Sequence, residues 1–81
     1  MVSARVTVTL KNGVLDPQGK AIESGLAGLG FDGIASVRQG KVFDIEIDAK
    51  DAKTAKTELA KMCEKLLANT VIENYRVEVG G

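Results

Sequence analysis

Apolar and polar residues alternate along the first ten positions of the chain. The apolar members of this pattern are Val2, Ala4, Val6, Val8 and Leu10, and serine, arginine and threonine lie between them. A period of two is typical of a β-strand that buries one face and exposes the other to solvent. The pattern therefore predicts a strand over residues 2–10, which Asn12-Gly13 brings to an end.

A helical pattern begins after residue 15. Asp16 is a good N-cap, because its carboxylate can accept from the free N–H groups of the first turn, and Pro17 suits the first helical position. The apolar stripe that follows consists of Ile22, Leu26 and Leu29. Gly30 lies where a left-handed residue would end the helix. We expect a helix that starts at Pro17, buries this stripe and stops before Gly30.

Residues 34–48 have the pattern of extended chain. The apolar positions of one parity are Val37, Phe43, Ile45 and Ile47. Gln39-Gly40 interrupts this segment, and two structures fit the interruption equally well. One is a tight hairpin at Gly40, and the other is a single long strand with a kink there, because the parity is the same in both.

A second helix is predicted over residues 51–68, and a last strand over residues 71–79. The apolar stripe of this helix consists of Ala52, Ala55, Leu59, Met62 or Cys63, and Leu66. In the last strand Tyr75, Val77 and Val79 alternate with polar residues, which again indicates one buried face. Both elements therefore offer an apolar side to the same core.

The order of elements is β-α-β(β)-α-β, which indicates an α+β, two-layer sandwich in a single domain over residues 1–81. We expect an antiparallel sheet with both helices on one face. The other face would carry Arg5, Thr7, Thr9 and Arg38 or their counterparts, and a chain of 81 residues has nothing left to cover it. Stacking of a second copy on this face, or pairing of edge strands, is therefore expected, as a homodimer or a tetramer.

Composition restricts the chemistry. Eleven basic and eleven acidic residues give a formal charge of zero, which argues against a nucleic-acid binder or a polybasic membrane tether. The chain has no histidine, so Ser-His and Cys-His nucleophiles and His-containing zinc sites are excluded. Cys63 is the only cysteine and is expected to be a buried structural thiol in a cytoplasmic protein. We predict no catalytic residue, no metal site and no cofactor on this chain.

Two short polar segments are candidate functional sites: Asp16-Pro17-Gln18-Gly19 and Arg38-Gln39-Gly40-Lys41. The first could present helix N–H groups to an anion, but capping alone explains Asp16, whose charge would repel an anion. The second could bind a phosphate or an acidic partner, or could be an ordinary solvated hairpin.

Four segments spread over nearly the whole chain match the pattern of a known family. They are Lys11–Gly19, Leu29–Phe31, Val37–Lys41, and Cys63–Asn69 running into Val71–Tyr75. On these segments the chain resembles the PurS family, the small subunit of phosphoribosylformylglycinamidine synthase, also called formylglycinamide ribonucleotide amidotransferase. Thr70 departs from a proline often found there, and Asn74 departs from an aspartate.

The resemblance implies an accessory subunit without an active site of its own. In that family the PurL subunit binds ATP, Mg²⁺ and formylglycinamide ribonucleotide and performs the ligation, and the PurQ subunit releases ammonia from glutamine. The small subunit is needed to assemble the other two, and any part in ammonia transfer stays open. On this reading the partner-contact candidates are Asp16, Pro17, Gln18, Gly19, Arg38 and Lys41.

One alternative from another class remains at this point. A free-standing βαββαβ module that senses a small ligand would also lack catalytic residues and would also dimerise through its sheet. Stabilisation by a ligand would distinguish such a module from an assembly subunit.

Overall fold

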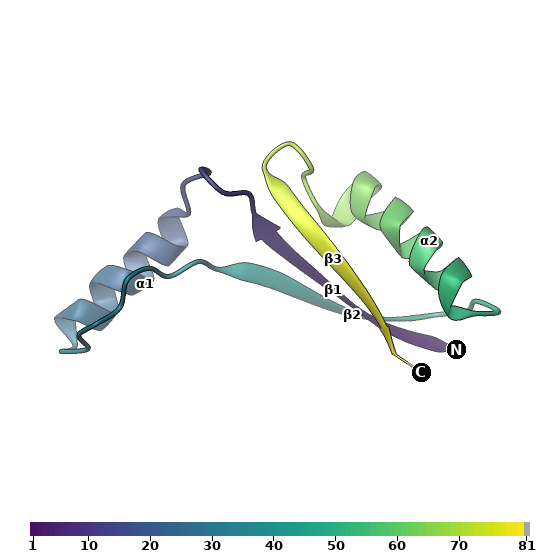
Figure 1. Cartoon of the computed structure of the whole chain (residues 1–81), viewed down its shortest axis with the longest axis horizontal. Helices are drawn as coiled ribbons and strands as arrows, with labels where there is room; N and C mark the ends of the chain where they lie inside the picture. Colours follow the sequence, from purple (N-terminus) through teal and green to yellow (C-terminus); the bar gives the residue numbers. More distant parts are fainter. Residues whose placement is uncertain (81) are drawn as a thin grey trace.

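The computed structural model describes residues 1–80. Strands and helices follow one another in the order β-α-β-α-β (Figure 1). Their bounds are β1 Val2–Leu10, α1 Pro17–Gly28, β2 Gly40–Ile47, α2 Ala52–Met62, the π-helical turn η1 Cys63–Leu67, and β3 Glu73–Gly80. The predicted α+β class and the order of elements are confirmed, with one strand between the two helices.

β1 is the central strand of an open, three-stranded antiparallel sheet whose order is β2-β1-β3. Val6, in the middle of β1, lies opposite Phe43 on β2 and Val77 on β3. Because side chains alternate across a strand, this register places the apolar positions of all three strands on one face.

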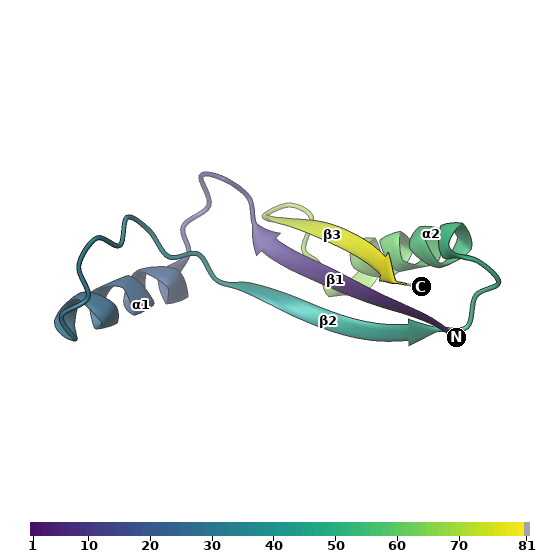
Figure 2. The ribbon, with the colours of Figure 1, turned by 60° about the horizontal axis from the view of Figure 1, so that its bottom comes forward.

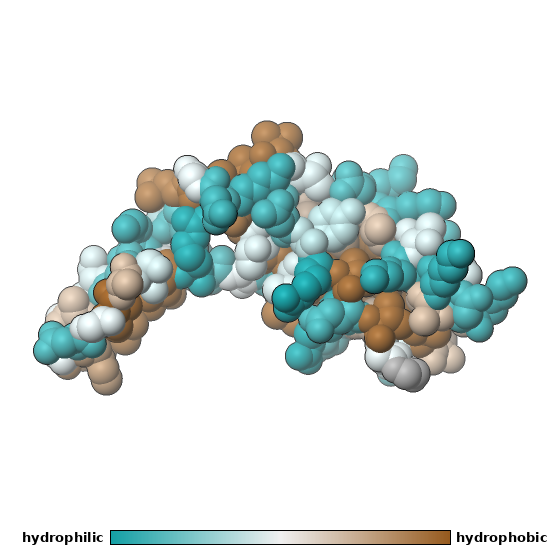
Figure 3. Space-filling view, viewed as in Figure 1, coloured by the Kyte–Doolittle hydropathy of each residue, from teal (hydrophilic) through white to brown (hydrophobic). Residues whose placement is uncertain are grey.

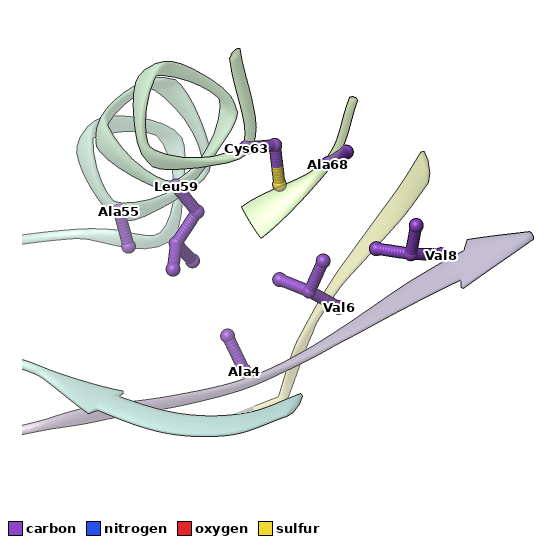
Figure 4. Close-up of a cluster of buried hydrophobic side chains, with 7 residues drawn as sticks. All are labelled: Ala4, Val6, Val8, Ala55, Leu59, Cys63 and Ala68. Atoms are coloured by element: carbon purple, nitrogen blue, oxygen red, sulfur yellow. The ribbon is translucent and has the colours of Figure 1, made fainter. Parts of the chain in front are cut away.

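α2 covers the apolar face of the sheet, and the hydrophobic core lies between the two layers (Figure 2). The buried apolar residues are Ala4, Val6, Val8, Ala55, Leu59, Cys63 and Ala68 (Figure 4). Val6 and Leu59, from opposite layers, are both 0% exposed. We call the three strands with α2 and η1 the body of the molecule.

The end of the second helix departs from the predicted stripe. The N–H of Ala68 donates to the carbonyl of Cys63 at 3.0 Å, a wider turn than that of an α-helix. This turn places Ala68 in the core and leaves Leu66 84% exposed. The prediction that Leu66 belongs to the buried stripe is therefore wrong, because it assumed regular α-helical spacing to the end.

α1 does not cover the sheet, which corrects the expectation that both helices lie on one face. It extends beyond the end of the sheet, so that the molecule measures 50 × 26 × 15 Å (Figures 1 and 2). The physical reason is that α2, η1 and Ala68 already cover Ala4, Val6 and Val8. The predicted stripe of α1 is consequently unburied, with Leu29 76% exposed.

The C-terminal end of α1 matches the prediction. Gly30 has a φ of +93°, its N–H donates to the carbonyl of Ala27, and the N–H of Phe31 donates to the carbonyl of Leu26. This pair of hydrogen bonds is a Schellman motif, which needs a left-handed residue that glycine adopts without strain.

The chain returns from α1 to the sheet without forming a hairpin or one long strand. Residues 31–39 are irregular, and β2 begins at Gly40, so neither structure considered for the interruption is the one observed. A Cβ at Gly40 would lie 2.7 Å from the carbonyl oxygen of Val8, so glycine allows close approach to β1 there. We call residues 11–39, which include α1, the arm.

Candidate functional site

The two polar segments singled out in the sequence meet where the arm leaves the body. They line a groove of about 390 Å³ together with residues of β1 and β3. Its lining consists of Val8, Leu10, Asp16, Pro17, Gln18, Gln39, Gly40, Lys41 and Glu73. Residues more than twenty positions apart in the sequence therefore form one surface feature.

Asp16 is at the centre of this junction. Its Oδ1 accepts from the N–H of Gly19 at 2.9 Å, which is the predicted helix cap. Its Oδ2 accepts from the N–H of Gln39 at 2.7 Å, on the returning segment of the arm. These two backbone donors, with the nearby Arg38 guanidinium, hold the pKa of Asp16 below its usual range.

Asp16 is buried in the isolated chain, because only 5% of its surface is exposed. Gly19 is buried beside it, and a Cβ there would overlap the carbonyl oxygen of Val37. Both residues therefore have local structural roles at the junction. Pro17, at the first helical position, and Gln18 are exposed at the rim of the groove.

Arg38 and Lys41 are exposed, but they do not form a turn. The Arg38 Nη2 donates to the carbonyl of Lys11 at 3.1 Å, across the base of the arm. Lys41 is the second residue of β2, and its Nζ lies 3.6 Å from Oε2 of Glu73. The expected basic hairpin is thus the place where the arm rejoins the sheet.

The arm has an exposed apolar surface that the sequence pattern does not predict. Phe31 is 58% exposed, and Leu15, Ile22, Leu29 and Ile34 are exposed as well (Figure 3). Leu15 and Phe31 flank the helix and lie outside its stripe, so periodicity alone did not identify them. Within residues 11–39 the structure buries no apolar side chain fully.

The open face of the sheet is polar and ion-paired. Arg5 lies between Asp44 and Glu78 in the register, and its Nε lies 2.8 Å from Oδ1 of Asp44. This ion pair lowers the pKa of Asp44, and both side chains are largely exposed. The predicted polar positions Arg5, Thr7 and Thr9 do lie on this face, whereas Arg38 lies before the start of β2 and therefore outside the sheet.

Cys63 has the buried position expected of a structural thiol. It is fully enclosed in the core, and burial together with Glu64 raises its pKa. Among the described residues, no group of three or more His, Cys, Asp or Glu side chains is placed to hold a metal ion. None of the helices within residues 1–80 has the length and apolar character needed to cross a membrane.

Comparison with known proteins identifies the family. The family model PurS, described as phosphoribosylformylglycinamidine (FGAM) synthase, matches residues 3–81. The chain belongs to the PurS family. A curated PurS subunit from Synechocystis sp. is 52% identical over 75 residues, which cover 93% of this chain and 75% of that protein.

Solved structures of the PurS family share the fold. The crystal structure of Methanocaldococcus jannaschii PurS has a TM-score of 0.91 and 40% identity, and the match covers 99% of this chain and 96% of that chain. A chain in the structure of PurLQS from Thermotoga maritima has a TM-score of 0.88 and 31% identity, over 98% and 96% of the two chains. The chain is accordingly an accessory subunit of FGAM synthase, in purine biosynthesis.

Proposed function

We propose that this chain is a non-catalytic subunit that brings the glutaminase and the synthetase of FGAM synthase together. The observation that carries the proposal is the likeness over 98% of the chain to a chain of the PurLQS structure. The structure adds an elongated shape and an arm with exposed apolar side chains, which suits a subunit that bridges others. ATP and Mg²⁺ would then be bound by the PurL-type synthetase, not by this chain.

We further propose that the chain assembles with itself, as a dimer or a tetramer. The arm supports this, because it exposes Leu29 and Phe31 together with three further large apolar side chains. Large exposed apolar side chains concentrated on one segment indicate an interaction surface. The two edge strands β2 and β3 offer a second way for copies to associate.

The rim of the groove is proposed to contact the partner subunits. Gln18 and Lys41 are polar and exposed and line the groove from two distant segments, and the exposed Arg38 directly precedes the groove residue Gln39. A cytoplasmic location is also proposed, on the strength of membership in a family of purine biosynthesis.

Reconstitution tests the proposal. The chain, the synthetase and the glutaminase from the same organism are mixed, and co-elution and FGAM formation from glutamine are measured with and without the chain. We expect co-elution and glutamine-dependent activity only when the chain is present, while activity with added ammonia persists without it. Full glutamine-dependent activity in its absence would contradict the proposal.

The rim residues are tested in the same assay. Gln18→Ala and Lys41→Ala are expected to weaken co-elution, whereas Lys56→Ala, an exposed lysine of α2, provides the matched control. Equal co-elution for all three variants would remove the groove rim from the interface.

A further inference from the structure

The arm is connected to the body through a narrow polar neck, which consists of Lys11, Asp16, Gly19, Arg38 and Gln39. We propose that the Asp16 carboxylate locks the outgoing and returning ends of the arm together and so sets the direction in which α1 leaves the body. The proposal rests on the proposed function, since the purpose of a fixed arm is to present its surface for assembly.

Packing does not explain the direction of the arm. α1 makes no extensive contact with any strand or with α2 in the described part of the chain. The two buried residues of the arm are Asp16 and Gly19, and both lie in the neck. The geometry of the neck must therefore hold α1 at its angle to the sheet.

The carboxylate joins the two ends directly. Gly19 belongs to the outgoing end and Gln39 to the returning end, and each donates its N–H to a different oxygen of Asp16, at 2.9 and 2.7 Å. Hydrogen bonds to a charged acceptor are stronger than those between neutral groups. Low exposure of Asp16 strengthens them further, because little water competes for the carboxylate.

Gly19 makes this close approach possible. Its Cα faces the backbone of the returning segment, and any Cβ would overlap the Val37 carbonyl oxygen and lie 2.9 Å from Oδ2 of Asp16. The combination of an aspartate cap and a glycine three positions later is thus explained by the neck and not by helix formation, which requires no glycine there.

A second set of hydrogen bonds joins the two ends of the neck. The Arg38 guanidinium donates to the carbonyl of Lys11, and the N–H of Lys11 donates to the carbonyl of Ile72 at 2.8 Å. These bonds connect the returning end, the outgoing end and the segment before β3. The neck is therefore fixed to the body as well as closed on itself.

The variant Asp16→Asn separates the lock from the helix cap. Asparagine is also a good N-cap, but its amide nitrogen would face the N–H of Gln39, where both groups are donors. Asp51→Asn is the matched control, because Asp51 caps α2 by accepting from Thr54 at 2.7 Å and makes no cross-neck bond.

The first readout is the arm itself, in the full-length chain. Spin labels on Ser24→Cys of α1 and on Lys50→Cys, in the connection between β2 and α2, report the distance between arm and body when the labelled chain is diluted with unlabelled chain. We expect Asp16→Asn to broaden this distance distribution and to speed hydrogen exchange at Gln39 roughly tenfold or more. An unchanged distribution with unchanged exchange at Gln39 would overturn the proposal.

Fast hydrogen exchange at the β1 amides would show that Asp16→Asn unfolds the chain. In that case a second variant, Gly19→Ala, tests the lock. Gly19→Ala retains the carboxylate but forces the two ends apart, and it should broaden the same distribution. Normal arm geometry in Gly19→Ala would count against the lock.

Assembly is the second readout. We expect Asp16→Asn to weaken co-elution with the synthetase and glutaminase about tenfold, and Asp51→Asn to leave it unchanged. If the unmodified chain does not co-elute, the proposed function fails while the distance measurement still decides the lock. Normal assembly by a variant whose arm is displaced would overturn the role of the lock in assembly.

Discussion

The arm and the body use the same kind of helix in opposite ways. α1 and α2 have 12 and 11 residues, and each begins with an aspartate that accepts from the N–H three positions later. α2 buries Ala55 and Leu59 against the sheet, whereas the buried residue of α1 is Gly19. Local capping thus starts both helices, and only packing decides which of them becomes part of a core.

The largest effect is expected in the body, where the core is small and closely packed. Leu59→Ala should lower the free energy of unfolding by about 2–5 kcal/mol, since it removes a fully buried side chain and leaves a cavity. Leu29→Ala on the arm should change it by less than about 0.5 kcal/mol at concentrations where the copies are dissociated, because Leu29 is then exposed. Urea denaturation measures the free energy of unfolding of both variants. Equal losses of stability would contradict the conclusion that the body has a core and the arm has none.

The next largest effect is expected on self-association through the arm. Leu29→Ser with Phe31→Ser should weaken self-association about tenfold or more, because large apolar side chains provide most interface energy. Leu66→Ser is the control, since Leu66 is a leucine of the body that is at least as exposed as Leu29 and Phe31. Sedimentation velocity over a concentration series measures the constants. If only Leu66→Ser weakened self-association, the interface would lie on the body and not on the arm.

A smaller effect concerns pH. The folded pKa of Asp16 is lowered by its bonds to Gln39 and Gly19, so its stabilisation is present above the unfolded pKa of about 3.9 and disappears as pH falls through the folded value. Exchange at α1 amides should differ between wild type and Asp16→Asn at neutral pH, and the difference should vanish in acid. If the exchange rates of wild type and Asp16→Asn differed by the same factor from neutral pH to acid, the charge of Asp16 would not be what stabilises the helix start.

The smallest effect is expected on the open face of the body. Arg5 and Asp44 form an ion pair with good geometry, but both side chains are largely in water. A double-mutant cycle of Arg5→Ala and Asp44→Ala should give little coupling, and less still in high salt. Strong coupling in the isolated chain would show that this face is more rigid than its exposure implies.

The sequence predicts the body far better than the arm. Alternation in β1 identifies Ala4, Val6 and Val8 as core, because side-chain parity is fixed by strand geometry alone. The same reasoning wrongly places α1 on the sheet. A stripe of apolar residues indicates that a helix face becomes buried, but it does not show which surface buries that face. An interface between chains and a core within one chain require the same pattern.

Only the part of the candidate site that depends on local sequence preference is predictable. Asp16 and Pro17 are recognised as a helix start from local preference, and the structure confirms both positions. The partner of Asp16 at Gln39 was not predictable, because the donor is a backbone N–H that carries no signature in the sequence. The steric role of Gly19 was hidden likewise, because it depends on a carbonyl 18 positions away.

Thr9 pairs directly with Gly40, so β1 and β2 are the two sides of a hairpin whose connection happens to be the whole arm. Shortening that connection from about thirty residues to four would lower the entropy cost of closing it by about 1.8 kcal/mol, at 0.6 kcal/mol for each halving. The chain therefore retains a long insertion that hinders the pairing of its own strands. The arm is thus an insertion between two paired strands of the body, and changes in its length should affect the assembly more than the sheet.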